Sequence, residues 1–296
     1  MTFRFDRVSY CYPDGTNALK SISLELGKGK KIALVGTNGS GKTTLLLQMN
    51  GILKPTFGKL YFEGRCIEYG QAFLTELRKR VGYVFQDPND QLFAATVRQD
   101  VAFGPLNMGL SLDEVKGRVN EALETVEMID YANKPPHFLS MGQKKRVAIA
   151  GVLAMRPDII IMDEPTSELD GKMVDQIMGL LSKLNSEGKT VIISTHDVDL
   201  ALEWADQALV LRSGTLLAQG PPMEIFDNED TLARSGLKIP LRLELFNHLK
   251  NHADSLERPF NLDDLITWLL PRNNDPTTGN LMYRKTLLDA KQSWNP

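Results

Sequence analysis

A glycine-rich segment after a short apolar run constrains the fold of this chain more than any other feature. The segment is Gly36-Thr37-Asn38-Gly39-Ser40-Gly41-Lys42-Thr43, which matches the pattern GxxxxGK[ST]. It follows the apolar run Lys31–Gly36 and precedes the apolar stretch Leu45–Met49. A continuous apolar run is typical of a strand covered on both faces of a sheet. The order of strand, glycine-rich loop and helix therefore predicts an α/β fold with a loop that can surround a phosphate.

The residues of this loop have distinct expected roles. Glycines let successive backbone N–H groups curl around a phosphate, and the N-terminus of the next helix adds its positive dipole. Lys42 is expected to reach the β- and γ-phosphates of a nucleotide, and Thr43 is expected to ligate Mg²⁺. The alternative is a glycine-rich turn without function, but chance matches arise in only about one chain per hundred of this length. The flanking strand and helix argue further against that alternative.

A second buried strand is expected over Asp158–Asp163, where the apolar residues are followed by the acidic pair Asp163-Glu164. The carboxyl ends of parallel strands meet at one edge of a sheet, which is where ligands bind. Asp163 is therefore expected to hold Mg²⁺ through water, and Glu164 to act as the base that positions an attacking water. A solvated surface pair is the alternative for an acidic dipeptide at a strand end, and the phosphate loop makes that alternative weak.

Two further polar segments are candidates for the same site. His196 directly follows the apolar run Thr190–Thr195, so we expect it at the same sheet edge, although a lone histidine is often only structural. The segment Leu139–Gln143 precedes a helix. Ser140 and Gln143 have the spacing of a capping box, and the capped helix N-terminus is a candidate second anion site.

The remaining elements surround this sheet. Loose alternation over Phe3–Tyr12 and over Ile22–Leu26, with a turn signal between them, predicts an antiparallel sheet at the N-terminus. Gly171–Asn185 has the pattern of a helix between two buried strands, which indicates a parallel sheet with right-handed crossovers. A last hairpin is expected from Ala208–Arg212 and Thr215–Gln219.

Residues from about Asp87 to Pro157 have a different pattern, without a buried strand. The stretch Ser111–Ile129 places apolar residues on one helical face. These residues are Leu112, Val115, Val119, Ala122, Leu123 and Val126. The segment is therefore predicted to be a helical insert in the α/β domain.

The chain is expected to divide near residue 235, into a nucleotide-binding domain over residues 1–235 and an appendage over residues 236–296. Leu241–Lys250 is predicted to be a short helix, and Asn261 is a candidate cap for another helix that Pro271 ends. The polar tail beyond Pro271 is expected to be poorly ordered.

Composition excludes several classes of protein. The formal net charge of −3 lacks the basic excess of a nucleic-acid-binding domain. The N-terminus has no apolar run typical of a signal peptide, and the longest apolar run, Val147–Met155, is shorter than the roughly 18 residues of a membrane span. The protein is therefore expected in the cytosol, with any membrane association through a partner. Cys11 and Cys66 form no CxxC pair and are expected to be small buried side chains.

Taken in order, these motifs resemble those of the nucleotide-binding subunits of ABC transporters, over roughly residues 3–235. Gly36–Thr43 resembles Walker A, Gln86 the Q-loop, Leu139–Gln143 the signature motif, Ile159–Glu164 Walker B, Ser167–Asp170 the D-loop, and His196 the switch histidine. Tyr12 resembles the aromatic residue that stacks on adenine, with Tyr10 as the second candidate and core packing as the alternative for either.

The resemblance implies a head-to-tail dimer, for which two copies of this chain suffice, with two Mg-ATP molecules between the protomers. Each nucleotide would lie between the Walker motifs of one chain and Ser140–Gln143 of the other. Catalytic roles are implied for Glu164, His196, Gln86 and Lys42, and Mg²⁺ ligation for Thr43, Gln86 and Asp163. The implied nucleotide contacts are Tyr12, Gly36, Thr37, Asn38, Gly39, Ser40, Gly41, Lys42, Thr43, Thr44, Ser140, Gly142 and Gln143.

One residue departs from the family's pattern. The signature motif is usually Leu-Ser-Gly-Gly-Gln, whereas Met141 replaces the first glycine here. A side chain at this position restricts the backbone and adds bulk near a bound γ-phosphate. This departure puts the rate of hydrolysis in question, but not the existence of the site.

A narrower likeness concerns the partner proteins. Val84–Phe93 and Ala102–Asn107 resemble the energy-coupling-factor ATPases of prokaryotic importers, and Gly142–Met155 is most similar to the cobalt/nickel branch. The likeness implies a scaffold subunit in the membrane that docks near Gln86–Phe93, a separate substrate-capture subunit, and a location on the cytoplasmic face of the membrane. Vitamin uptake through the same architecture and a soluble ABC-type ATPase are the alternatives, although the long coiled coil or second cassette of the soluble types is missing.

Overall fold

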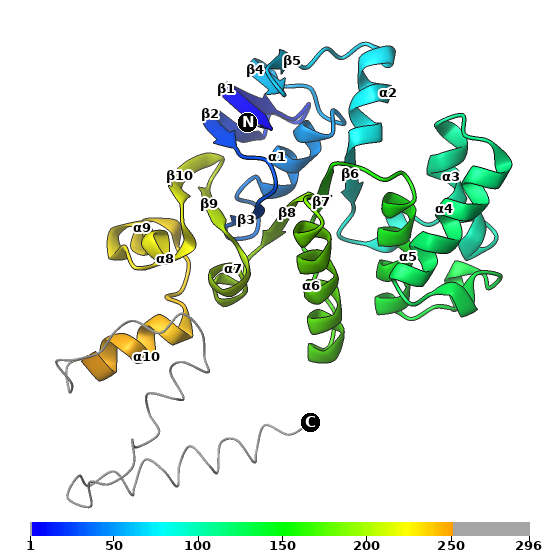
Figure 1. The fold of residues 1–296 in the computed structure, drawn as a ribbon. Helices are drawn as coiled ribbons and strands as arrows, with labels where there is room; N and C mark the ends of the chain where they lie inside the picture. Colours follow the sequence, from blue (N-terminus) through cyan, green and yellow to red (C-terminus); the bar gives the residue numbers. More distant parts are fainter. Residues whose placement is uncertain (1, 251–296) are drawn as a thin grey trace, which may run out of the picture. The chain divides into compact units, whose positions relative to one another are not determined.

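The fold was examined in a computed structural model that describes residues 2–250 of the chain (Figure 1). The compact unit that carries the predicted motifs extends to Glu244. The helix predicted over Leu241–Lys250 is present as α10 with the same bounds. The predicted cap at Asn261, the helix end at Pro271 and the polar tail lie outside the described residues, and the predicted boundary near residue 235 stays a prediction.

The N-terminal strands form the antiparallel sheet that the sequence predicts. Its strands run in the order β2-β1-β4-β5. Their bounds are β1 Phe3–Cys11, β2 Asn17–Leu26, β4 Phe57–Phe62 and β5 Arg65–Cys66. Alternate residues of β1, including Phe3 and Phe5, are buried, as expected for a strand with one face in the core.

The six-stranded sheet has the order β10-β9-β3-β8-β7-β6, and all neighbours are parallel except the β9–β10 hairpin. The bounds are β3 Lys31–Val35, β6 Val81–Val84, β7 Ile159–Met162, β8 Thr190–Thr195, β9 Gln207–Arg212 and β10 Thr215–Gly220. Strand β6 was not predicted. It has four residues, includes a glycine, and directly follows the charged helix α2 (Gln71–Arg80), so its apolar signal is weak.

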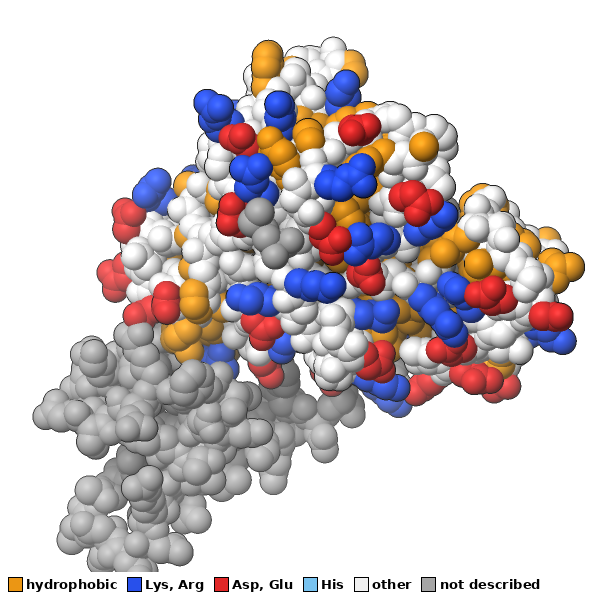
Figure 2. All heavy atoms as spheres, turned by 45° about the horizontal axis from the view of Figure 1, so that its top comes forward, with side chains coloured by type: hydrophobic (Ala, Val, Ile, Leu, Met, Phe, Trp, Pro, Cys, Tyr) orange, Lys and Arg blue, Asp and Glu red, His pale blue; other side chains and the backbone are white. Residues whose placement is uncertain are grey.

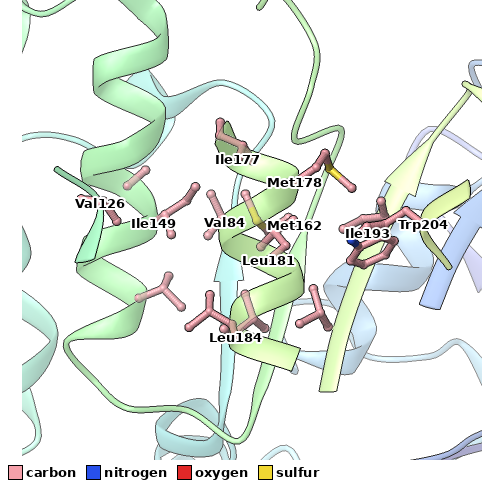
Figure 3. Close-up of a cluster of buried hydrophobic side chains, with 14 of the residues drawn as sticks. Val84, Val126, Ile149, Met162, Ile177, Met178, Leu181, Leu184, Ile193 and Trp204 are labelled. Carbon is pink, nitrogen blue, oxygen red and sulfur yellow. The ribbon is translucent and has the colours of Figure 1, made fainter. Parts of the chain in front are cut away.

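The parallel strands are continuously apolar because each of them faces two cores. Along β7, Ile159 and Ile161 belong to the core shared with the antiparallel sheet and α1 (Lys42–Met49). Ile160 and Met162 belong to the other core, on the opposite face of the sheet. Figure 3 shows this second core, in which Met162 lies among Ile177, Leu181 and other side chains of α6 (Gly171–Ser186).

The helical insert between β6 and β7 contains helices and no strand, as predicted. Its helices are η1 Pro88–Asp90, α3 Val97–Asn107, α4 Leu112–Thr125, η2 Ile129–Tyr131, η3 Pro136–Phe138 and α5 Met141–Leu153. The predicted apolar face of α4 is buried except at its first residue. Leu112 is 77% exposed, so the apolar face is not buried along its whole length. Leu112 begins the helix directly after the cap Ser111, where the chain enters from the surface.

Three further helices lie beside the six-stranded sheet: the first packs beside β3, and the other two pack beside β9 and β10. They are α7 Val198–Trp204, α8 Pro222–Phe226 and α9 Glu229–Ser235. Phe226 and Leu232 from α8 and α9 belong to the same core as α6. The surface in Figure 2 carries interspersed Lys, Arg, Asp and Glu side chains without a large region of one sign, which agrees with the small net charge.

The cysteine prediction is wrong for one residue. Both cysteines are free, as expected, but Cys66 is exposed and Cys11 is only half-buried. Cys66 lies on β5, a two-residue strand at the edge of the antiparallel sheet. An edge strand this short has little neighbouring chain to cover its side chains.

We predict that Leu181→Ala lowers the free energy of unfolding by about 2–5 kcal/mol, because the truncation leaves a cavity in the core between α6 and the sheet. Leu112→Ala is the matched control, since the same atoms are removed from an exposed helical position. It should change the free energy of unfolding by no more than about 0.5 kcal/mol. Denaturant titration measures both, and a similar loss for the two variants would contradict the burial described here.

Candidate active site

The candidate site lies at the carboxyl ends of β3, β6, β7 and β8, because parallel strands end at a common edge of the sheet. The glycine-rich loop follows β3, Gln86 follows β6, Asp163 and Glu164 follow β7, and His196 follows β8. The α/β topology therefore brings together four segments that lie far apart in the sequence (Figure 1).

The loop Gly36–Thr43 requires glycine at several of its positions. Gly39 and Gly41 have φ angles of 75° and 104°, in the left-handed region that side chains disfavour. A Cβ at Gly36 would come within 2.5 Å of the Leu211 carbonyl oxygen, so the backbone here approaches a neighbouring strand closely. The glycines thus set the shape of the loop, as the sequence pattern indicates.

Lys42 is buried at the first position of α1 and points back over the loop. Its Nζ donates to the Gly36 carbonyl oxygen at 2.8 Å and forms an ion pair with Glu164 Oε1 at 3.3 Å. The other carboxylate oxygen, Glu164 Oε2, lies 3.0 Å from His196 Nδ1. The structure therefore joins the predicted cation, base and histidine in one chain of contacts.

Ser194 on β8 orients both acidic residues, and sequence reasoning missed it. Its hydroxyl donates to Asp163 Oδ1 and accepts the backbone N–H of Glu164 at 2.8 Å. Ser194 and Asp163 are both buried. Thr190 and Thr195 carry hydroxyls in the same strand, so the sequence does not single out Ser194.

Tyr83 on β6 is a second missed contact of Asp163. Its hydroxyl donates to Asp163 Oδ2 at 3.4 Å. Burial, with a smaller contribution from the negative charge of Asp163, raises the pKa of Tyr83 well above its usual value. The hydroxyl therefore keeps its proton and remains a donor to this carboxylate.

The three predicted magnesium ligands line one cavity. Thr43, Gln86 and Asp163 face it, and so do Met141, from the start of α5, and further acidic residues. Hydroxyl, amide and carboxylate oxygens form the donor set that suits Mg²⁺. Residues from three separate segments thus offer oxygen ligands to the same space, and this chemistry fits the implied ion.

The signature segment lies in the helical insert, at the N-terminus of α5. Ser140 and Gln143 form the predicted capping box: Ser140 Oγ accepts the Gln143 N–H at 3.3 Å, and Gln143 Oε1 accepts the Ser140 N–H at 3.0 Å. A Cβ at Gly142 would lie 3.0 Å from the terminal methyl of Met173 on α6. The polar side chains of this segment therefore bond to each other rather than to the phosphate loop.

Tyr12 lies beside the phosphate loop. Its hydroxyl shares a hydrogen bond of 3.0 Å with Thr44 Oγ1, and Thr44 directly follows the predicted magnesium ligand. The Tyr12 ring packs edge-to-face on Tyr10, with the ring centroids 4.8 Å apart. Of the two aromatic candidates, Tyr12 is the one with a hydrogen bond to the residue that directly follows the loop.

Comparison with known proteins identifies the family. The family model described as "ABC transporter" matches residues 19–167. The chain therefore belongs to the ABC transporter family, and it is an ATP-hydrolysing subunit. No helix within residues 2–250 is long and apolar enough to cross a membrane.

Particular relatives narrow the class to ATPases of the energy-coupling-factor type. The "Energy-coupling factor transporter ATP-binding protein EcfA" of Methanocaldococcus jannaschii is 53% identical over 83% of this chain and 88% of that protein. The protein of the same name from Methanothermobacter thermautotrophicus is 49% identical over 82% of this chain and 78% of its own length.

Solved structures agree with the fold. cbiO1 from Clostridium perfringens, described as part of the ABC transporter complex cbiONQ, has a TM-score of 0.71 and 44% identity, covering 84% of this chain and 98% of that one. A dimeric structure of the ATP-binding cassette MJ0796, bound to ADP and phosphate, has a TM-score of 0.69 and 33% identity. It covers 74% of this chain and 98% of that one. The predicted fold class is confirmed.

We predict that Ser194→Ala lowers kcat for ATP hydrolysis by at least about tenfold, because the Asp163 carboxylate and the Glu164 backbone lose their shared partner. The matched control is Ser182→Ala on α6, which removes a hydroxyl that accepts the Trp204 indole N–H far from the strand ends. This control variant should keep kcat within about twofold of the wild-type value. Steady-state kinetics on both variants decides, and equal rates for the two would contradict the role of Ser194.

Proposed function

We propose that this chain binds Mg-ATP at Gly36–Thr43 and hydrolyses it with Glu164 as the general base, in a dimer that powers an energy-coupling-factor importer. The observation that carries the proposal is the Glu164 carboxylate, held between Lys42 and His196 at the edge of the sheet where the phosphate loop ends. A base must reach both the nucleotide and an attacking water, and this edge is the place where both would lie.

Each residue of the site has a separate role in phosphoryl transfer. Catalysis of this reaction consists mainly of positioning and electrostatic stabilisation. Lys42 supplies positive charge to the β- and γ-phosphates, and Glu164 accepts a proton from the attacking water. His196 orients the Glu164 carboxylate and contacts the γ-phosphate. Magnesium, when bound, neutralises phosphate charge, and Thr43, Gln86 and Asp163 are the residues that would hold it.

The second half of each site comes from another copy of the chain. Ser140 and Gln143 cap the helix N-terminus, and their capping box does not use the backbone N–H groups of Met141 and Gly142, which suit a phosphate. The Ser140 and Gln143 side chains make no hydrogen bond to the phosphate loop of their own chain among the contacts described. This arrangement supports a head-to-tail dimer, and the dimeric structure of the related cassette MJ0796 is consistent with it.

The docking surface for the membrane scaffold is proposed on the helical insert near Gln86–Phe93. Phe93 is 68% exposed, and its ring packs edge-to-face on the half-exposed ring of Phe103 at 4.9 Å. Leu106, on the same helix as Phe103, is exposed as well. Hydrophobic side chains are visible on the surface of the insert, at the right of Figure 2. An exposed apolar patch next to Gln86 suits an apolar helix of a membrane protein, and the ATPase would then sit on the cytoplasmic face of the membrane.

The transported substrate is proposed to be a cobalt or nickel ion. The support is the likeness of Gly142–Met155 to the cobalt/nickel branch and the similarity to cbiO1. Vitamin uptake through the same architecture is the second candidate, since the relatives named EcfA carry no substrate in their names. The ATPase does not contact the substrate in either case, so the capture subunit decides between them.

We predict that Glu164→Gln reduces turnover to below about a tenth of the wild-type rate while ATP binding is retained, because the carboxylate is needed as a base and not to hold the nucleotide. With ATP, this variant should elute as a dimer on size exclusion. Hydrolysis above that level would remove Glu164 from its proposed role. A monomer at saturating ATP would rule out the dimer.

We predict that the complex of this ATPase with the membrane subunits that co-purify with it takes up labelled cobalt or nickel ions in ATP-loaded vesicles. The matched control is the same complex with Glu164→Gln, which should give background uptake. Uptake of a labelled vitamin and of no metal would replace the proposed substrate with the second candidate. Failure to co-purify with any membrane protein would contradict the transport role.

A further inference from the structure

A buried lysine on the signature helix has no role in the mechanism above. Lys145, in the second turn of α5, is 1% exposed. Burial lowers the pKa of Lys145 from its usual value, although nearby carboxylates, Glu168 first and Glu164 next, act in the opposite direction. Burying a charged amine is costly, and an apolar side chain would serve packing better.

All the hydrogen bonds of this ammonium go to one short segment of chain. Lys145 Nζ donates to the Glu164 carbonyl oxygen at 3.2 Å, to the Ser167 carbonyl oxygen at 3.2 Å and to Ser167 Oγ at 3.3 Å. An ammonium group has three donors, so its bonding capacity is filled. Lys145 therefore holds the turn that begins at the proposed catalytic base and ends at the start of the D-loop.

The turn from Glu164 to Ser167 contains an unfavourable backbone conformation, which contacts from other segments can stabilise. Glu164 has a φ of 46°, in the left-handed region, which costs about 1–2 kcal/mol for a residue with a side chain. Ser167 closes the turn, since its N–H and its hydroxyl both donate to the Glu164 carbonyl oxygen, at 3.2 and 2.9 Å. The backbone conformation of Glu164 fixes where its carboxylate points, so the contacts of Lys145 bear directly on the base.

The backbone of Lys145 belongs to the same helix as the signature segment. Met141–Lys145 is continuous helix, and the capping box of Ser140 and Gln143 fixes its first turn. The backbone of Lys145 thus lies on the helix that would face the nucleotide bound by the partner chain. Its side chain contacts the turn that carries Glu164 of its own chain. Helices and closed turns shift as units, so a movement of one end would be felt at the other.

We propose that Lys145 is a positioning residue that transmits engagement of the signature segment to the Glu164 carboxylate, and so links the two ATP sites of the dimer. The inference rests on the proposed head-to-tail dimer. Lys145 contacts neither nucleotide in this scheme, and it acts through the carbonyl oxygens of Glu164 and Ser167.

The test compares ATPase rate per chain against protein concentration for wild type, Lys145→Met, Lys145→Arg and Lys144→Met. Lys145→Met keeps the aliphatic stem and removes the donors, whereas Lys145→Arg keeps donors. Lys144 is the matched control, because it lies on the same helix and donates outward to Asn89 Oδ1 at 2.8 Å. Dimer formation with ATP is measured for each variant in the Glu164→Gln background.

Wild type and Lys144→Met should show a rate per chain that rises as dimers form. Lys145→Met should form the dimer with an affinity for ATP within about threefold of wild type, and its rate should stay at least about tenfold lower at every concentration. Lys145→Arg should recover part of the increase in ATPase rate per chain with protein concentration. If Lys145→Met is too unstable to assay, Lys145→Leu carries the same comparison, because it also removes the donors.

Two results would overturn the inference. One is a Lys145→Met rate that rises with concentration as in wild type. The other is a loss of dimer formation in proportion to a lowered melting temperature, which would make the lysine merely structural. A wild-type rate that is independent of concentration would instead overturn the proposed dimer, and that outcome is read from the wild-type protein alone.

Discussion

Buried charge at the edge of the parallel sheet is the constraint on which the rest of this structure depends. The side chains of Lys42, Lys145, Asp163 and Glu164 are almost fully removed from solvent. Each of them would be strongly destabilising without a partner. Their partners lie on β6, β8, α1 and α5 and directly after β3 and β7, so the strand register and the position of the helical insert must be correct together before the charges are satisfied.

Much of this arrangement could be predicted from the sequence, because the relevant signals are local. Walker-type loops require glycine at fixed spacing, and buried parallel strands are continuously apolar; both patterns are visible from Lys31 to Thr43 and from Ile159 to Glu164. The capping box at Ser140 and Gln143 is local as well, and the structure contains it with both hydrogen bonds. Family resemblance added the order of the motifs and their association with a transporter.

Other features could not be predicted, because they depend on contacts between distant segments. Strand β6 is too short to give a clear pattern, and the exposure of Leu112 and Cys66 depends on what the fold leaves uncovered. Ser194, Tyr83 and Lys145 are ordinary residues in their own segments. Their importance appears only where β8, β6 and α5 meet the end of β7, because a hydrogen-bond partner has no sequence signal of its own.

The left-handed backbone of Glu164 implies a trade-off between stability and activity at this position. Side chains other than glycine, asparagine and aspartate are disfavoured at such φ values, so the fold holds a glutamate where a glycine would relax the chain. Functional sites often retain strain of this kind, and a more stable protein results when it is released. A glycine at this position would therefore relax the backbone, but it would remove the carboxylate on which the proposed mechanism depends.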